Sequence, residues 1–455
     1  MHQNNITQGS IPGQLMKFFF PIWLGTFFQF FYNTADAVIV GNFVGKEALA
    51  SVGGSAATII NLLVGFFVGL SSGAAVIISQ FYGARNKDCT GRAVHTAMAL
   101  SLAAGILLTV LGIGLSPMIL RAMGTPEEIL DFSVTYLRIY FAGVVFNLIY
   151  NVGAGILRAI GDSRRPLYFL IVCSIVNVVL DIVFVLVIPM GVAGVALATI
   201  IAQAVSAVLV IVSLQKAPPI YRLELKKIGF DFDILRQIIH IGLPAGLQSV
   251  MYSVSNIVIQ ASVNSFGTNT VAAWTAYGKI DGLFWMTVSS FGIAITTFVG
   301  QNFGAKEYGR VKKSVRVCMW IALGFTVVLS VGLLLLGPWL YRMFTTDVDV
   351  VKIGVDMLSW MVPFYFTYVA IEILSGAVRG AGDAILPMII TCLGVCVLRV
   401  VWIMVVVPMY PNIRTTCLSY PVTWSITSIL FIIYYLQGGW LKRCIAKADH
   451  KAEPS

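Results

Sequence analysis

Charged residues are scarce in this sequence of 455 residues: Asp, Glu, Lys and Arg together make up 11% of it. A soluble domain carries about 25%. Enzyme signatures such as HExxH and Walker A are missing, and the seven cysteines form no CxxC pair. These absences argue against a soluble enzyme and against a zinc or disulfide framework. We expect no enzymatic activity and no bound cofactor.

Hydrophobic residues are abundant instead. They make up 58% of the chain, and the mean hydropathy is +0.88. Because a membrane helix needs roughly 20 apolar residues, this content is enough for about twelve spans. The same figures exclude a disordered chain, a fibrous protein and a nucleic-acid binder. The sequence predicts an all-α polytopic protein embedded in a lipid bilayer.

Twelve apolar runs separated by short polar turns define the expected spans. They cover residues 17–41, 51–80, 93–119, 131–157, 166–189, 193–215, 234–265, 271–300, 314–338, 350–378, 385–408 and 417–440. Basic residues near the ends of spans stay cytoplasmic, and twelve spans place 22 of the 30 on the side of the termini and six on the other. We therefore predict that both termini lie on the cytoplasmic side of the membrane. The net charge of +10 then reflects topology, and no nucleic-acid partner is expected.

The chain contains an internal repeat. The segment SQFYGAR at 79–85 recurs as GQNFGAK at 300–306, and LRAIGDSRRP at 157–166 recurs as VRGAGDAILP at 378–387; both pairs are 221 residues apart. Six spans per half make the repeat parallel, with its axis along the membrane normal. Transporters built in this way bind substrate between or within the halves and expose it alternately to the two sides.

The repeat divides the chain into four predicted parts. These are an N-terminal lobe of six helices at 1–214, a cytoplasmic linker at 215–233, a C-terminal lobe of six helices at 234–441 and a cytoplasmic tail at 442–455. The N-terminal lobe is expected to hold the coupling ion. The predicted fold is therefore a pair of pseudo-symmetric lobes with twelve transmembrane helices, functional as a monomer.

Asp36, Asp181, Asp281 and Glu372 are acidic residues that lie inside predicted spans. A charged side chain at the centre of a membrane helix costs about 2.5–3.5 kcal/mol, so such residues are usually functional. The alternative is an acid satisfied by a neighbouring donor, or one at the membrane interface. That alternative stays open, most of all for Asp281 and Glu372.

Asp36 and Asp181 are predicted to belong to one polar cluster. Tyr32 precedes Asp36 by four residues and Asn177 precedes Asp181 by four, so each pair shares a helix face. Thr199 and Asp181 lie nine residues on either side of the turn between the fifth and sixth spans, which places them at matching depth. Such a cluster suits a proton relay or a Na⁺ ion. The expected Na⁺ ligands are Asp36, Asn177, Asp181 and Thr199.

The repeat shows that the fold does not require these acids. The matching positions of the second half carry Ile259 and Val400 in their place. Glu372 is the mirror case, since its first-half counterpart is Asn151. Each half is thus predicted to have specialised. Arg399, inside the eleventh span, is expected either to neutralise Glu372 or to extend toward the interface.

These motifs together resemble the multidrug and toxic compound extrusion (MATE) family over nearly the whole chain. The resemblance rests on the two six-helix lobes, LRAIGD and VRGAGD after the fourth and tenth spans, GQNFGA after the eighth, and IPMGVAGVALATIIAQ between the fifth and sixth. It implies a cation-coupled antiporter that exports bulky, amphipathic, often cationic and aromatic compounds by alternating access. The coupling ion would be H⁺ or Na⁺.

The resemblance also implies roles for single residues. The pattern is similar to the prokaryotic branch whose coupling acids lie in the N-terminal lobe. The matching residues are Tyr32, Asp36, Asn177, Asp181 and Thr199. Pro21 matches a proline that bends the first helix and offers a hinge, while Tyr368 stands where the other branch has an acid. The candidates for the substrate cavity are Asn151, Lys279, Asp281, Tyr368 and Glu372.

Two other functions also fit twelve spans. A flippase for lipid-linked saccharides has a related architecture, but it needs a cationic cavity for pyrophosphate, and only Lys279 and Arg399 are basic residues away from the ends of the spans. An ion channel needs no coupling between ion and organic substrate, and channels more often build pores from several subunits. Efflux of an organic cation under imposed ion gradients distinguishes the three.

Overall fold

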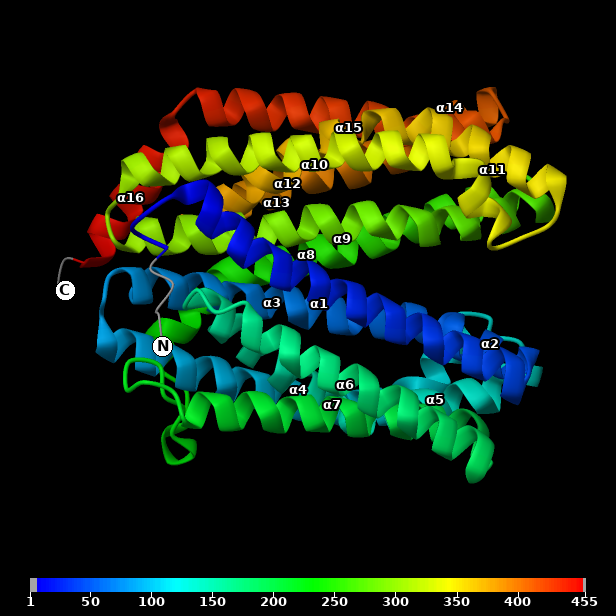
Figure 1. Ribbon diagram of the computed structural model, residues 1–455, viewed down its shortest axis with the longest axis horizontal. Coiled ribbons are helices and arrows are strands. Elements are labelled where there is room, and N and C mark those ends of the chain that lie inside the picture. Colours follow the sequence, from blue (N-terminus) through cyan, green and yellow to red (C-terminus); the bar gives the residue numbers. More distant parts are fainter. Residues whose placement is uncertain (1–5, 453–455) are drawn as a thin grey trace. The chain divides into compact units, whose positions relative to one another are not determined.

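The computed structural model describes residues 6–452 and is helical almost throughout (Figure 1). Contacts within the chain divide it into two units. The first unit contains Lys17–Ser249, and the second contains Thr7–Met16 and the chain from Val250 onward. The division falls inside two long helices, and the lobe boundaries expected at 214 and 234 stay predictions.

The helices of the first unit pack mainly around one central helix. They are α1 (Ile11–Ile39), α2 (Lys46–Gly53), α3 (Ser55–Gly83), α4 (Lys87–Ala122), α5 (Glu127–Ala159), α6 (Arg164–Ile182), α7 (Gly191–Gln215) and the first part of α8 (Phe232–Asn264). Short π-helical segments, Val40–Val44 and Val183–Val187, follow α1 and α6, and a 3₁₀ turn lies at Leu225–Lys227. The central helix is α5, which packs against α3, α4 and α7.

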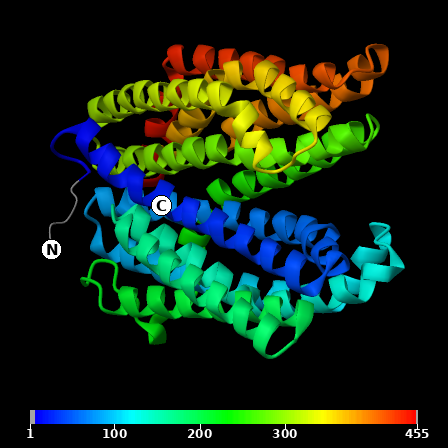
Figure 2. The ribbon, with the colours of Figure 1, turned by 45° about the vertical axis from the view of Figure 1, so that its right-hand side comes forward.

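The second unit continues from α8. Its helices are α9 (Thr268–Gly304), α10 (Tyr308–Arg342), α11 (Val348–Met361), α12 (Tyr365–Gly380), α13 (Ile385–Thr391), α14 (Leu398–Met409), α15 (Ile413–Leu436) and α16 (Gly439–Ala452). Here α12 is the central helix, and it packs against α9, α10 and α15. Figures 1 and 2 both show α9 and α10 side by side.

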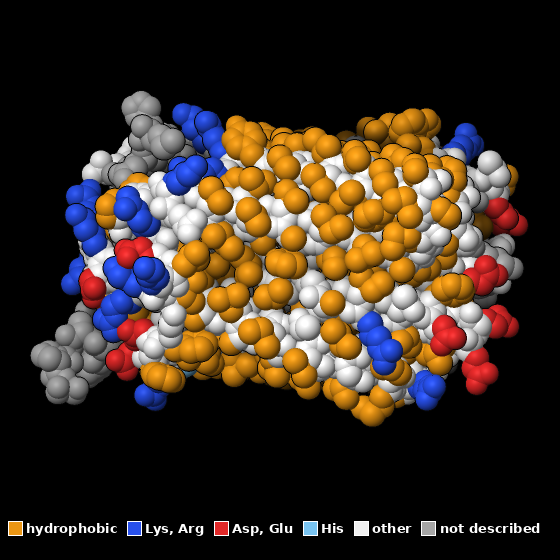
Figure 3. Space-filling view, turned by 90° about the horizontal axis from the view of Figure 1, so that it is seen from below, with side chains coloured by type: hydrophobic (Ala, Val, Ile, Leu, Met, Phe, Trp, Pro, Cys, Tyr) orange, Lys and Arg blue, Asp and Glu red, His pale blue; other side chains and the backbone are white. Residues whose placement is uncertain are grey.

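Ten stretches of helix in the described residues are long and apolar enough to cross a membrane. Helices α1 and α8, with 29 and 33 residues, add two further long segments. On the face shown in Figure 3, hydrophobic side chains cover the middle of the helices and charged side chains gather mostly toward the ends. This distribution is the one that a hydrocarbon layer selects, because apolar side chains face the lipid and charges stay in the interface.

Two predicted spans change helix type near their middle in the described residues. The run at 350–378 breaks into α11 and α12 at a 3₁₀ turn, Val362–Phe364, because Pro363 has no backbone N–H to donate to the preceding turn. The run at 385–408 contains a π-helical segment, Cys392–Val397, between α13 and α14. A hydropathy pattern reports apolar length and does not resolve such local changes in helix type.

The backbone reproduces the internal repeat. Arg85 after α3 and Lys306 after α9 both adopt the left-handed conformation, with φ of 56° and 60°. Gly161 and Gly382 follow the same rule after α5 and α12, with φ of 94° and 101°. Each pair is separated by 221 residues in the sequence. The two halves therefore end equivalent helices with the same left-handed cap.

Glycines allow α3 and α8 to approach closely within the first unit. A Cβ on Gly69 would lie 2.7 Å from the Cα of Gly246, and one on Gly65 would lie 2.8 Å from Ser249 Oγ. Gly73 faces Gly242 in the same way.

The letters GLSSG at 69–73 match the GxSxG pattern of hydrolases, but they lie within a continuous helix and not on the strand-to-helix turn that such a nucleophile needs.

Candidate functional site

A polar cluster lies inside the first unit, on helices that are otherwise apolar. Asp36 is on α1, while Asn177 and Asp181 are on α6, four residues apart and on one face. Asn177 and Asp181 are 1% and 0% exposed. Burying a carboxylate without a compensating charge is costly, so this placement calls for a proton or a cation.

The carboxyl groups of Asp36 and Asp181 lie against each other. When both are ionised they only accept hydrogen bonds, and neither can donate to the other. Five buried atoms of the cluster have no hydrogen-bond partner: Asp36 Oδ1, Asn177 Nδ2 and Oδ1, and Asp181 Oδ1 and Oδ2. These atoms are therefore available to accept a hydrogen bond from a ligand or to bind an ion, because no other group of the protein occupies them.

The chemistry of these atoms fits H⁺ or Na⁺. A proton held between two carboxyl groups turns one of them into a donor, and carboxylate and amide oxygens are the hard ligands that an alkali cation accepts. Within residues 6–452, no group of three or more His, Cys, Asp or Glu side chains can hold a metal ion.

Two tyrosines accompany the acids. Tyr32 precedes Asp36 by one turn of α1 and is 8% exposed. Tyr136 on α5 interacts electrostatically with both acids, and its ring stacks on Tyr140 with 6.3 Å between the centroids. Tyr136 was not among the predicted site residues. Its signal in the sequence is a pair of tyrosines four residues apart on an apolar helix, which places both hydroxyl groups on one face.

Thr199 and Pro21 occupy the elements on which they were expected. Thr199 is 7% exposed on α7, which packs along α6, and its hydroxyl donates to the Val195 carbonyl oxygen at 2.9 Å. That bond uses the proton and leaves the hydroxyl lone pairs available to a ligand. Pro21 lies within α1, and the helix continues through it from Ile11 to Ile39.

Asn151 lies apart from the acid cluster. Its amide nitrogen donates to the carbonyl oxygen and to Oδ1 of Asn147, both at 2.9 Å and both on α5. It follows Tyr136 by fifteen residues, which corresponds to roughly 22 Å along the helix axis. The structure does not bring Asn151 to the acids, and its role in a substrate cavity stays a prediction.

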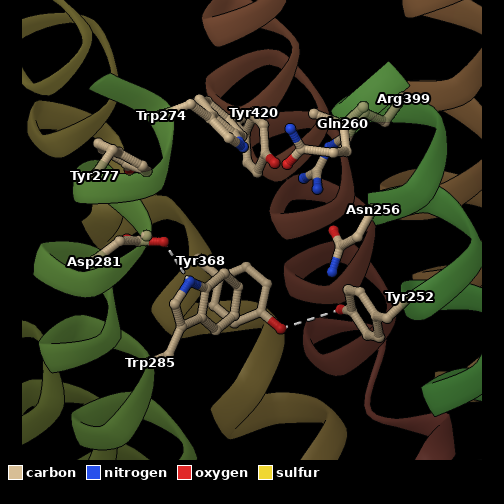
Figure 4. A pocket seen from close by; sticks show the side chains of 12 residues that line it. Tyr252, Asn256, Gln260, Trp274, Tyr277, Asp281, Trp285, Tyr368, Arg399 and Tyr420 are labelled. Carbon is tan, nitrogen blue, oxygen red and sulfur yellow. Dashed lines mark hydrogen bonds between the residues drawn. The ribbon is translucent and has the colours of Figure 1, made fainter. Parts of the chain in front are cut away.

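The second unit contains a pocket of about 550 Å³ (Figure 4). Its lining combines six aromatic residues with a few polar ones. The aromatic residues are Tyr252, Trp274, Tyr277, Trp285, Tyr368 and Tyr420, and the polar ones are Asn256, Gln260, Asp281 and Arg399. Pockets for drug-sized molecules measure about 300–1,000 Å³ and are mostly apolar with a few directed polar groups. This pocket has that size and character.

Asp281 is held by aromatic donors. Tyr365 Oη donates to its Oδ1 at 2.5 Å, and Trp285 Nε1 donates to its Oδ2 at 2.6 Å. Tyr277 extends the network through a 2.8 Å hydrogen bond with Tyr365. These neutral donors compensate the burial of Asp281 without supplying a counter-charge. Neither Tyr365 nor Trp285 was among the predicted site residues, although Trp285 follows Asp281 by one helical turn.

Tyr368 and Glu372, one turn apart on α12, have different surroundings. Tyr368 lines the pocket, and its hydroxyl shares a 3.0 Å hydrogen bond with Tyr252. The Glu372 carboxyl group packs against Gly292 on α9, at the place where a Cβ would otherwise stand. Only a residue without a side chain admits the carboxyl group there, so Gly292 is what allows the half-buried Glu372 to pack between the two helices.

Two further expectations for the second unit can be compared with the structure. Lys279 is exposed on α9 and is not among the residues that line the pocket. In the described part of the chain Arg399 forms no ion pair with Glu372, and its guanidinium lies 3.9 Å from the centroid of the Tyr420 ring. The expectation that Arg399 neutralises Glu372 is wrong, because the side chain of Arg399 points to α15.

The two halves also match one family model separately. The model named MatE matches residues 21–183 and 244–405, one copy in each half of the chain. The chain belongs to the MatE family. The two MatE matches confirm the predicted internal repeat and the all-helical, multi-pass membrane fold. MatE proteins form a family of transporters, so the expectation that this chain is not an enzyme is also confirmed.

Individual MatE relatives match along nearly their whole length. Probable multidrug resistance protein YoeA of Bacillus subtilis (strain 168) is 28% identical over 96% of this chain and 96% of its own length. Probable multidrug resistance protein YpnP of the same organism is 29% identical, over 88% of this chain and 89% of its own length.

A solved structure shows the same fold. It is described as an outward-facing conformation of a multidrug resistance MATE family transporter of the MOP superfamily. It superposes with a TM-score of 0.90 and covers 98% of this chain and 98% of its own. The sequence identity is 22%, so this likeness concerns the MatE fold and not the substrate.

Proposed function

We propose that this MatE protein is a cation-coupled antiporter that exports bulky, often cationic and aromatic organic compounds across the bacterial plasma membrane. The observation that carries the proposal is the acid pair of the first unit with the neighbouring Asn177, which together have five buried side-chain atoms without a hydrogen-bond partner. The relatives YoeA and YpnP, both described as probable multidrug resistance proteins, support the class of substrate.

Asp36 and Asp181 act together as the coupling site. Two carboxylates in a low-dielectric pocket cannot both stay ionised at little cost, so the pair retains a proton or binds a cation. Asn177 and Thr199 contribute neutral oxygens, and Tyr32 can donate to Asp36. H⁺ or Na⁺, when bound, supplies the compensating positive charge. This assignment places the protein in the branch with coupling acids in the N-terminal lobe.

Antiport requires that ion and substrate favour different conformations of the protein. Asp36 and Pro21 lie on the same helix, and a proline removes one backbone hydrogen bond and is a common site of bending. Neutralising Asp36 changes the charge that α1 carries and therefore changes which conformation of α1 is more stable. The substrate binds in the aromatic pocket of the second unit. In this proposal the ion acts on α1 and the substrate acts on the second unit, and both take part in the same transport cycle.

The orientation in the membrane belongs to the same proposal. Both termini, the linker at 215–233 and the tail at 442–455 lie in the cytoplasm, with the lobes at 1–214 and 234–441 on either side of the linker. The excess of basic residues on that side supports this placement. One chain contains both halves of the repeat, so a monomer is sufficient for transport.

Ethidium efflux from vesicles containing the purified full-length protein tests the proposed function. A proton gradient or a sodium gradient is imposed separately, and vesicles without protein serve as the control. We expect efflux that one of the two gradients accelerates, and the effective gradient identifies the coupling ion. An efflux rate that neither gradient changes would contradict the antiporter hypothesis. Ion current without ethidium movement would indicate a channel instead.

A flippase for lipid-linked saccharides is less consistent with the second unit. Its pocket has Arg399 but also the carboxylate of Asp281, and Lys279 does not line it. A pyrophosphate group carries several negative charges and is usually bound by more than one cationic side chain. Transfer of a fluorescent polyprenyl-pyrophosphate analogue between leaflets, with no ethidium efflux, would favour the flippase.

A further inference from the structure

Two cysteines of the second unit form a pair that the proposed transport function does not use. Cys392 and Cys396 lie four residues apart on the π-helical segment between α13 and α14. Their thiol groups interact directly with each other. Cys396 is 1% exposed, and Cys392 is partly exposed. Two soft sulfur atoms are therefore side by side within one helical segment.

The backbone of this segment is held in place by a neighbouring helix. Gly394 lies between the two cysteines, and a Cβ at that position would be 2.2 Å from Thr427 Oγ1 on α15. The π-helical segment therefore packs closely against α15 and presents both thiols from a fixed support. π-helical turns are rare and occur frequently at functional sites.

The number of ligands limits the kind of metal ion that the pair can bind. Within residues 6–452, no third His, Cys, Asp or Glu side chain joins the pair in a metal-binding group. Structural zinc takes four ligands, so the pair alone does not make a Zn²⁺ site. Thiolates select soft ions such as Cu⁺, which is stable with two sulfur ligands. The composition of the pair fits this class of ion.

The charge near the pair favours a monovalent ion. When two thiols bind one Cu⁺, each sulfur donates an electron pair to the metal and each thiol releases its proton to the solvent, with no change of oxidation state. The resulting bis-thiolate complex carries a charge of −1. Arg399, one helical turn beyond Cys396, interacts electrostatically with that thiol. A nearby guanidinium stabilises thiolates, and it therefore stabilises this complex.

The internal repeat gives the pair a counterpart in the first unit. The spacing of 219 residues between Asp181 and Val400 also separates Asn177 from Cys396. The second half therefore has a sulfur atom at the position where the first half has an amide. Carboxylate and amide oxygens suit hard ions, whereas thiolates suit soft ones. The two halves thus differ in the class of ion that these positions can bind.

We propose that Cys392 and Cys396 bind a soft monovalent metal ion, Cu⁺ or Ag⁺, between their two sulfur atoms. This site is separate from the coupling site of the first unit and needs neither of its acids. It borders the aromatic pocket, because Cys396 interacts electrostatically with Tyr252, which lines that pocket.

Competition for Cu⁺ tests the proposed site in the purified full-length protein in detergent. The competitor is the Cu⁺ chelator bathocuproine disulfonate, and a thiol-free reductant keeps the copper and the cysteines reduced. Wild-type protein is expected to retain one Cu⁺ per chain, and X-ray absorption should show sulfur alone around the metal. Cys392→Ser and Cys396→Ser should each lower the affinity for Cu⁺ at least about a hundredfold, because one of two ligand bonds is lost.

A matched double variant controls for the loss of thiols in general. Cys318→Ser/Cys417→Ser removes two buried cysteines, one on α10 and one on α15, and leaves the proposed pair intact. Its affinity for Cu⁺ should stay within about twofold of wild type, since both proposed ligands remain. Cys392→Ser/Cys396→Ser removes the same number of thiols and should retain no Cu⁺ against the competitor.

The possible outcomes each decide the proposal. Loss of Cu⁺ in the variants of the pair, with retention in the control and an unfolding temperature close to wild type, supports it. No Cu⁺ retained by wild type, equal retention by the variants of the pair, or an equal loss in the control overturns it. If the variants of the buried Cys396 do not fold, Cys392→Ser decides, since Cys392 is partly exposed. Ethidium efflux is measured separately without metal, so the antiporter and the thiol site can fail independently.

Discussion

At the scale of single residues, the proposed coupling depends on groups whose charge matters more than their size. Asp181 and Asn177 occupy one face of α6, and Asp36 meets Asp181 from α1. Replacing an aspartate by asparagine conserves volume and removes the titratable group. Such variants separate the chemistry of the acid pair from the packing around it.

The first prediction concerns this pair. Asp36→Asn and Asp181→Asn should each insert and fold normally but lose gradient-driven export, and the double variant should be little worse than either single one. The reason is that a shared proton or ion needs both carboxyl groups, so the first substitution already abolishes ion binding and the second cannot reduce it further. Ethidium efflux from vesicles measures the effect, with Asp88→Asn, an exposed acid of α4, as the control. Full, ion-dependent efflux in either single variant would contradict the proposed site.

Glu372 gives the second prediction. It belongs to the second unit, packs against Gly292 and is not part of the acid pair. Glu372→Gln should therefore change the affinity for substrate or the preference among substrates, while efflux keeps its dependence on the ion gradient. Export rates for several organic cations at a series of ion gradients provide the measurement. Loss of the ion dependence in this variant would assign coupling to the second half instead.

At the scale of helices, close approach is decided by small residues at the crossing points. α3 and α8 meet along Gly65, Gly69 and Gly73 on one side and Gly242 and Gly246 on the other. Lipid does not drive such helices together by the hydrophobic effect, so contact between backbones provides much of the attraction. α8 also runs from the first unit into the second.

The third prediction tests this crossing. Gly69→Ala should destabilise the protein by about 1–3 kcal/mol, because the new Cβ would stand 2.7 Å from the Gly246 backbone and the helices must separate. Gly114→Ala on α4 is the control, since nothing lies within 4 Å of its Cβ position and alanine is the better helix former. Thermal unfolding in detergent compares the two variants. Equal unfolding temperatures for both would contradict a role for the glycine contact.

At the scale of the whole molecule, the repeated halves share their helix caps but differ in charge. The left-handed residues after α3 and α9 and after α5 and α12 recur at the same spacing. The acid pair occurs only in the first half, and the second half has a pocket with Arg399 and Asp281. Duplication thus preserved the elements that shape the fold, and the buried polar residues diverged.

The fourth prediction concerns orientation. A single cysteine introduced into the linker at 215–233, in a chain with its native cysteines replaced, should be labelled by an impermeant reagent only after the cells are opened. A cysteine at Ser265, between α8 and α9, should react in intact cells, because the distribution of basic residues places that loop outside. Labelling of the linker in intact cells would reverse the proposed topology.

The sequence by itself determined the membrane class, the number of long helices and the repeat, and it located acidic residues inside the apolar runs. Each of these depends on a property that is read along the chain: apolar length, the distribution of basic residues, the offset between motifs, and a charge inside an apolar run. The break in the helix at Pro363 shows what hydropathy does not predict, because hydropathy reports the length of an apolar run and not whether the helix through it is continuous.

Only the tertiary structure decided which side chains meet. It brought Tyr136 to the acids, Tyr365 to Asp281 and Arg399 to the Tyr420 ring. Periodicity does not reveal such pairings in a membrane protein, because the face toward lipid and the face toward protein are both apolar. The direction of each side chain depends on how neighbouring helices are rotated and packed, and that information appears only when the helices are assembled.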